Sequence, residues 1–284
     1  MLSFSKGRPI AKIVGGEFNN EILFLDSGDN KLCCDDCTEK CERRRKKCCG
    51  GCQRSRSKCC GGGPKYDEED EIGQQIHLRQ GKLIPLPNYE TRIPFIAGPS
   101  GSGKSTYASL LAENYLRINP GNDFYLFSRK DTDPVLDKLN PIRIKLDESL
   151  IEDPIDMTTE LTGGTLILFD DVNTLQNDKI KKAIDKLMND IMEVGRSYDI
   201  TIMITNHLVI PNEKKQARTI MNEMQSMTVF PKSGSAQQIK YALKTYFGLD
   251  KNQIENIINL PSRWVTIFKG FPQTVMYENG AFIL

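Results

Sequence analysis

An eight-residue stretch from Gly98 to Ser105 has the residue types and spacing to bind the phosphates of a nucleotide. It reads Gly-Pro-Ser-Gly-Ser-Gly-Lys-Ser, and it lies between an apolar run at 93–97 and a helical pattern. Glycines let the backbone curl so that successive N–H groups face a phosphate chain at the positive end of the helix that follows. Lys104 is expected to reach the β- and γ-phosphates, and the Ser105 hydroxyl to bind Mg²⁺.

The alternative is a Gly/Ser-rich turn that happens to hold a lysine, but the flanking strand and helix favour nucleotide binding. The predicted nucleotide-binding residues are Gly98, Pro99, Ser100, Gly101, Ser102, Gly103, Lys104, Ser105 and Thr106.

Two carboxylates, Asp170 and Asp171, follow a second apolar run at 165–169, which is the Walker B pattern. The carboxyl edge of a parallel sheet is where a Mg-nucleotide sits. Asp170 is predicted to hold Mg²⁺ through its water shell, and Asp171 to orient or deprotonate the attacking water. Alone, the pattern could be a strand that runs into an acidic turn; after a P-loop it favours hydrolysis.

A third apolar run at 200–204 ends in Thr205 and Asn206. This order is typical of ATPases in which the third strand lies between the P-loop strand and the Walker B strand. Asn206 is predicted to be catalytic, because an amide there can hydrogen-bond the attacking water or the γ-phosphate. The alternative is a plain turn-forming Asn. His207 is expected to be an incidental neighbour.

Arg196 precedes that third run and has two interpretations. It is either an arginine finger delivered to the γ-phosphate of a neighbouring subunit, or a cap on the C-terminal carbonyls of the preceding helix.

The elements that must position these residues suggest an α/β fold. The chain has 284 residues and a net charge of +1, enough for one P-loop domain with appendages and too balanced to indicate a nucleic-acid binder by bulk charge. We predict a P-loop NTPase with a RecA-like (additional-strand), mostly parallel sheet flanked by helices, and with a C-terminal β-hairpin at 264–268 and 274–277. No apolar run reaches the ~20 residues of a membrane span, and no signal peptide is recognisable, so a soluble protein without membrane contact is expected.

Composition divides the chain into a short N-terminal β segment (1–25), a Cys-rich, charged insert (26–71) and an ATPase domain (72–284). Two short strands in the first segment are expected to add to a sheet edge. The insert holds all nine cysteines and almost no aliphatic residue, which predicts disorder. Its paired cysteines could bind Zn²⁺, lie free, carry lipid beside the basic run at 43–47, or accompany nonspecific DNA contact. The candidate zinc ligands are Cys34, Cys37, Cys49 and Cys52.

These motifs resemble the DNA-packaging ATPases of poxviruses and other nucleocytoplasmic large DNA viruses, within the FtsK/HerA superfamily. The resemblance covers about 93–284: the P-loop, the strand at 124–127, the Asp-Asp strand, Val194-Gly195-Arg196 before the third strand, and the hairpin from Arg263. Ser197 stands where that family usually has His, and Asn206 where it has Gln. The resemblance implies a homo-oligomeric ring that hydrolyses ATP between subunits and moves double-stranded DNA into a capsid, with a capsid or portal-type partner. It places the protein in the host cytoplasm (virus factory), the virion, or both.

Two other functions fit part of the pattern. A small-molecule or nucleoside kinase would need a second acceptor site and a lid arginine cluster, whereas the paired carboxylates suit water as the acceptor. A nucleotide-gated nucleic-acid-binding adaptor would use the Cys/Arg-rich insert and hydrolyse weakly.

Overall fold

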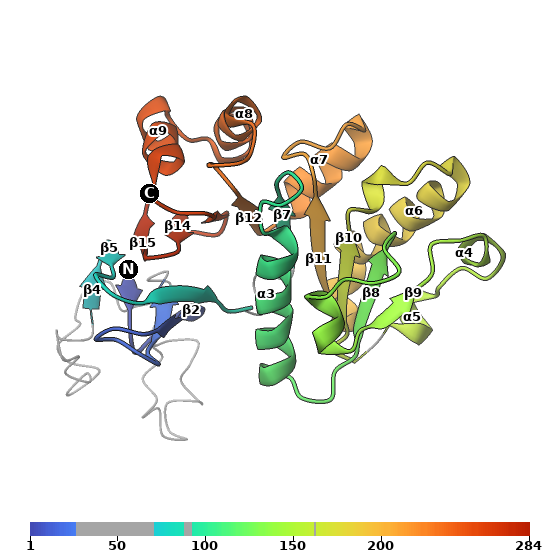
Figure 1. The fold of residues 1–284 in the computed structure, drawn as a ribbon, viewed down its shortest axis with the longest axis horizontal. Helices are drawn as coiled ribbons and strands as arrows, with labels where there is room; N and C mark the ends of the chain where they lie inside the picture. The colour runs from blue at the N-terminus through green and yellow to red at the C-terminus, as the bar shows by residue number, and fades with distance from the viewer. Residues whose placement is uncertain (27–70, 88–92, 162) are drawn as a thin grey trace, which may run out of the picture.

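The computed structural model describes residues 1–26, 71–87, 93–161 and 163–284, which form two β-sheets with helices packed against them (Figure 1). The predicted insert and its candidate zinc ligands lie outside these residues, apart from the two end positions, and remain a prediction. The larger sheet has ten strands in the order β5-β15-β14-β13-β12-β7-β11-β10-β8-β9. Their bounds, in that order, are Gln75–His77, Gly280–Ile283, Thr274–Tyr277, Val265–Phe268, Ser226–Val229, Pro94–Ala97, Thr201–Asn206, Leu166–Asp170, Phe124–Ser128 and Ile142–Ile144.

The strands from β12 to β9 run parallel to one another. The P-loop strand β7, the third-run strand β11 and the Walker B strand β10 are neighbours, with β11 in the middle as predicted. The predicted mostly parallel α/β fold is confirmed. The C-terminal hairpin also forms, as β13 and β14, and is extended by β15 and then by β5, all antiparallel.

Helices cover both faces of the large sheet. They are α3 (Lys104–Ile118), α6 (Asp178–Val194), α7 (Lys214–Glu223), α8 (Ala236–Phe247) and α9 (Lys251–Asn259), with short α4 (Ser149–Glu152) and α5 (Met157–Glu160) and the 3₁₀ turns η2 (Leu136–Leu139), η3 (Val172–Thr174) and η4 (Gly195–Tyr198). Successive strand residues point to opposite faces. Ile167 and Phe169 therefore join one core cluster, with α6 to α9, while Leu166 and Leu168 join the other, with α3.

The smaller sheet is antiparallel, in the order β4-β1-β3-β2-β6. Its bounds in that order are Glu71–Gly73, Leu2–Ser3, Ile22–Leu25, Arg8–Val14 and Lys82–Pro85. The N-terminal strands, expected to add to a sheet edge, pair with β6 in this smaller sheet and not with a strand of the ten-stranded sheet. They form their own sheet, because β6 pairs with β2, and Ile10, Ile13 and Leu23 share a core with α3. The domain boundaries stay a prediction.

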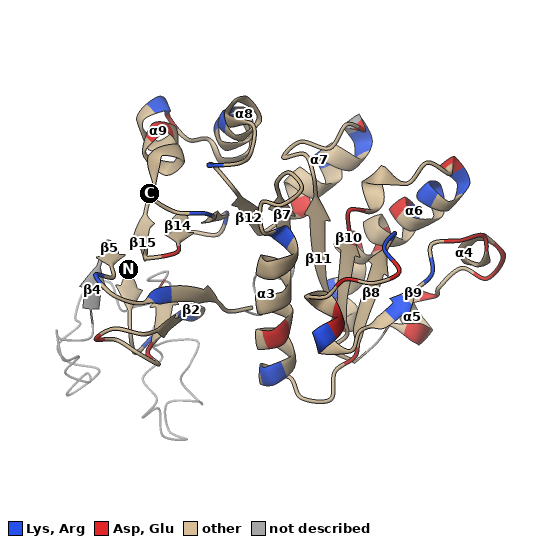
Figure 2. Ribbon diagram, in the orientation of Figure 1, with Lys and Arg blue, Asp and Glu red and all other residues tan. Residues whose placement is uncertain are grey.

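Charge on α6 is mixed rather than of one sign (Figure 2). Its sequence interleaves lysines with aspartates, as at Lys182, Asp185 and Lys186. This is the solvated face of an amphipathic helix, not a basic stripe.

Among the described helices, none combines the length and apolar content needed to cross a bilayer.

Candidate active site

The loop after β7 curls tightly before α3 begins. Gly101 and Gly103 have φ of +76° and +108°, a backbone region that side chains with a Cβ rarely adopt. Gly98 is required by contact: a Cβ there would lie 2.7 Å from Phe230 Cδ2 and 2.8 Å from Ser102 Oγ. The Ser102 hydroxyl is buried without a hydrogen-bond partner in the described part of the chain. The sequence thus dictates a curled loop at the N-terminus of a 15-residue helix.

Lys104 turns back over this loop and is only 6% exposed. Its Nζ donates to Gly98 O at 2.8 Å and lies 3.6 Å from Asp171 Oδ2. Burial lowers the pKa of Lys104, and the Asp171 and Asp170 carboxylates partly offset that effect. The structure therefore brings together Lys104 and Asp171, two of the residues that the sequence analysis selects.

Asp170, at the end of β10, is 2% exposed and is held by hydroxyls from both neighbouring strands. Thr205 Oγ1 on β11 donates to Asp170 Oδ1 at 2.8 Å, and Ser128 Oγ on β8 donates to Oδ2 at 3.0 Å. These bonds fix the carboxylate and leave lone pairs available. Thr205 and Ser128 reach Asp170 because β11 and β8 pair with β10 on either side. The sequence alone does not show which side chains this pairing brings to Asp170.

Asp171 has a left-handed backbone, with φ +50°, and its amide donates to Thr205 Oγ1 at 3.1 Å. Its Oδ2 meets Lys104, whereas Oδ1 is buried and has no hydrogen-bond partner among the described residues. Burial raises the pKa of Asp171, and the Lys104 charge acts in the opposite direction. A fixed carboxylate with one unpartnered oxygen is suited to accept a hydrogen bond or a proton.

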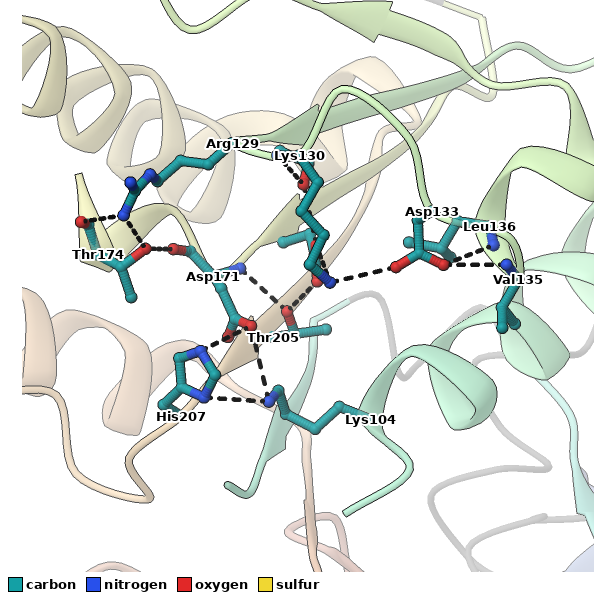
Figure 3. A network of polar contacts seen from close by, with 12 residues as sticks. Lys104, Arg129, Lys130, Asp133, Val135, Leu136, Asp171, Thr174, Thr205 and His207 are labelled. Carbon is teal, nitrogen blue, oxygen red and sulfur yellow. Dashed lines mark hydrogen bonds and ion pairs between the residues drawn. The ribbon is translucent and has the colours of Figure 1, made fainter. Parts of the chain in front are cut away.

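His207, expected to be incidental, lies between the two charged groups (Figure 3). Its Nε2 is 3.1 Å from Asp171 Oδ2, and its Nδ1 is 3.4 Å from Lys104 Nζ. In the neutral imidazole, an Nε2–H would donate to the carboxylate while Nδ1 accepts from the ammonium. The one feature of the sequence that could have indicated this role is the position of His207 directly after the third strand.

Two basic residues after β8, Arg129 and Lys130, lie near the carboxylates. The sequence analysis did not select them as site residues. Lys130 Nζ lies 3.2 Å from Asp133 Oδ2 and 3.8 Å from Asp170 Oδ2. Burial lowers the pKa of Lys130, but Asp170 and Asp133 more than offset this, so the pKa is raised overall. Arg129 Nη1 donates to Thr174 O at 2.9 Å, next to Asp171 (Figure 3).

Asn206 is buried beside the P-loop, and its backbone O accepts from Gly98 N at 3.0 Å. Its side-chain Oδ1 accepts from the Leu208 amide at 3.3 Å, so the amide group takes part in a local turn. The sensor role predicted for Asn206 remains a prediction.

Arg196 is not part of this group of residues. It is exposed in η4, before the first residue of β11, whereas the P-loop pairs with the last residues of that strand. A six-residue strand is about 20 Å long, so Arg196 lies at the opposite edge of the sheet. It lies too far away to serve the site of its own chain.

The oxygen donors at this edge suit Mg²⁺, which takes one or two protein ligands together with phosphates and waters. Ser105, in the first turn of α3, and the lone pairs left on Asp170 would hold it. Within the described ranges, no group of three or more His, Cys, Asp and Glu side chains is arranged around a metal position.

The fold is that of the P-loop NTPases of the additional-strand type. The chain belongs to the same family as uncharacterized protein V3 of Sputnik virophage, to which it is 41% identical over 216 residues, 76% of this chain and 86% of V3. No family profile matches the chain.

Several solved structures are similar in fold. The genome-packaging NTPase B204 of Sulfolobus turreted icosahedral virus 2, in complex with AMPPCP, is 10% identical with a TM-score of 0.46, covering 67% of this chain and 98% of B204. The conjugation coupling protein TcpA of pCW3, with ATPγS, is 11% identical with a TM-score of 0.47, covering 96% and 77% of the two chains. The type VII secretion ATPase EccC of Thermomonospora curvata is 13% identical with a TM-score of 0.48, covering 72% and 28%.

Thr205→Val is expected to lower ATP hydrolysis about 10- to 100-fold and to raise the Mg²⁺ concentration needed for half-maximal rate, because Asp170 loses a hydrogen bond that orients it. The measurement is the hydrolysis rate as a function of Mg²⁺. Thr201→Val, at the other end of the same strand, is the matched control and should leave both quantities unchanged. Equal behaviour of the two variants would contradict the role of Thr205.

Proposed function

We propose that this chain is an ATPase, with ATP–Mg²⁺ bound by the loop from Gly98 to Thr106. The observation that carries the proposal is the 3.6 Å approach of Lys104 Nζ to Asp171 Oδ2, with Asp170 buried beside them. Lys104 follows β7 and the loop after it, whereas both carboxylates come from the end of β10. Together they offer a phosphate-binding cation, a metal-binding carboxylate and a candidate base.

The incoming phosphates would compete with Asp171 for the Lys104 ammonium. Asp171 would then accept a proton from a water molecule as that water attacks the γ-phosphorus and the bond to the β–γ bridging oxygen breaks, giving ADP and phosphate. The His207 imidazole, 3.1 Å from Asp171 Oδ2, holds the carboxylate in place during this step. Mg²⁺, when bound, would offset the negative charge of the phosphates.

We further propose that hydrolysis drives the movement of double-stranded DNA into a capsid by a homo-oligomeric ring. This part is supported by the resemblance of five motifs to viral DNA-packaging ATPases, and by membership in a family with a virophage protein. A capsid or portal-type protein would be the docking partner, in the virus factory of the host cytoplasm or in the virion.

Arg196 is proposed to act on the γ-phosphate of a neighbouring subunit. Support comes from its exposure and from its distance from the site of its own chain. A ring brings one edge of a subunit against the next, and an arginine supplied in trans stabilises charge in the transition state.

Lys104→Ala is expected to abolish ATP hydrolysis, since the loop loses the cation that contacts the phosphates. In the wild-type chain, double-stranded DNA at low salt should raise the hydrolysis rate, because contacts to DNA phosphates are strongest there. Lys240→Ala, an exposed lysine on α8, is the control. Hydrolysis by Lys104→Ala at the wild-type rate would exclude the site. A wild-type rate indifferent to DNA would exclude the DNA motor but not the ATPase, and transfer of phosphate to a small molecule would indicate a kinase.

Mixed oligomers test Arg196. Neither Arg196→Ala nor Asp171→Asn alone should hydrolyse ATP well, whereas mixing the two creates interfaces with an intact Arg196 facing an intact Asp171. Partial recovery of activity on mixing is the expected result. Full activity of Arg196→Ala, or no recovery in oligomers shown to contain both variants, would leave Arg196 as a helix cap.

A further inference from the structure

A groove of about 300 Å³ opens beside the P-loop, where the two sheets approach each other. Gly103 and Thr106, the end of the P-loop and the start of α3, form one side. The strand β6 and the end of β2 form the second side. Arg263 and Trp264, just before β13, and Glu278, just after β14, form the third. We call it the Trp264 groove, after the side chain that lines it together with Leu83, Tyr107 and Arg263. It is continuous with the predicted phosphate site, because Gly103 and Thr106 belong to both.

The groove has an apolar floor and a charged rim. Leu83, Tyr107 and Trp264 are nearly buried, and the Tyr107 and Trp264 rings meet edge to face with centroids 5.0 Å apart. On the rim, Lys82 Nζ pairs with Glu278 Oε1 at 3.4 Å. A flat aromatic group with one polar end fits such a lining, and the volume is in the range of small-molecule sites.

Arg263 stands at the mouth of the groove. Its Nε lies 3.9 Å from the position that a Cβ on Gly103 would take, so the guanidinium is next to the P-loop backbone. Its amide donates to Glu278 Oε2, but its guanidinium has no hydrogen-bond or ion-pair partner within the described ranges. A planar, unpaired guanidinium over an apolar floor is suited to stack on a heteroaromatic ring.

We propose that the Trp264 groove holds the nucleoside end of the bound nucleotide, with the base between its apolar floor and the Arg263 guanidinium. The small sheet, through β6 and β2, then supplies a wall of the nucleotide site, although it lies outside the sheet that carries the P-loop. The proposal rests on the proposed function in one respect, that the phosphates occupy the P-loop.

The experiment compares ADP with pyrophosphate on the full chain, because both carry two phosphates and only ADP carries a nucleoside. Trp264 is the only tryptophan in the chain, so its fluorescence reports on the groove alone. ADP should bind at least about tenfold more tightly than pyrophosphate and change the Trp264 emission, whereas pyrophosphate should bind without that change. Equal affinities and no change in emission with either ligand would overturn the proposal.

Three variants test the contacts. Arg263→Ala and Arg263→Lys should both weaken ADP binding about fivefold to tenfold and leave pyrophosphate binding within about twofold, since a lysine keeps the charge but cannot stack. Val14→Tyr, at the exposed end of β2, should do the same by filling the groove from the small sheet. Arg79→Ala, an exposed arginine that is not among the groove residues, is the control.

These outcomes separate the two proposals. If the wild-type chain binds neither ADP nor pyrophosphate, the phosphate site itself is refuted. Normal binding of both, with ADP affinity unaffected by Arg263→Ala and Val14→Tyr, would refute only the nucleoside site. Wild-type ADP affinity in Arg263→Lys but not in Arg263→Ala would show that charge, not stacking, is what Arg263 supplies.

Discussion

The Thr205 hydroxyl donates to Asp170 Oδ1 at 2.8 Å and accepts from the Asp171 amide at 3.1 Å. One residue further on, Asn206 O accepts from Gly98 N at 3.0 Å, which ties the same strand end to the P-loop. The end of β11 therefore sets the spacing between the loop from Gly98 to Ser105 and the carboxylates. Because a hydrogen bond to a charged group contributes about 1.5–3 kcal/mol, displacing this strand end would disturb both halves of the site together.

Burial acts in opposite directions on the two charges that meet at this edge. It lowers the pKa of Lys104 and raises the pKa of Asp171, and each group offsets part of the effect on the other. His207 adds a third contact, with its Nε2 3.1 Å from Asp171 Oδ2. Each charge therefore offsets part of the cost of burying the other, and a phosphate that drew Lys104 away would make Asp171 more basic.

Local spacing made part of this site predictable, because the loop from Gly98 to Ser105 and the pair Asp170 and Asp171 depend on neighbours in the sequence. Contacts made only by strand pairing were missed: Ser128, Lys130 and His207 meet the carboxylates because β8, β10 and β11 lie side by side. The smaller sheet was not predicted for the same reason, since β6 pairs with β2 across a long stretch of chain. Arg196 could be placed away from the site only once the direction of β11 was known, because Arg196 precedes the first residue of that strand and the site lies at its last.

If Lys104 binds phosphate while Asp171 activates water, the two functions should separate in Asp171→Asn. We expect this variant to bind ATP at least as tightly as the wild type, because Lys104 loses a competing partner, and to hydrolyse it about 10²- to 10⁴-fold more slowly in a single turnover. Measuring ATP affinity and the single-turnover rate on the same sample tests this directly. Hydrolysis near the wild-type rate, or a loss of ATP binding, would contradict the account.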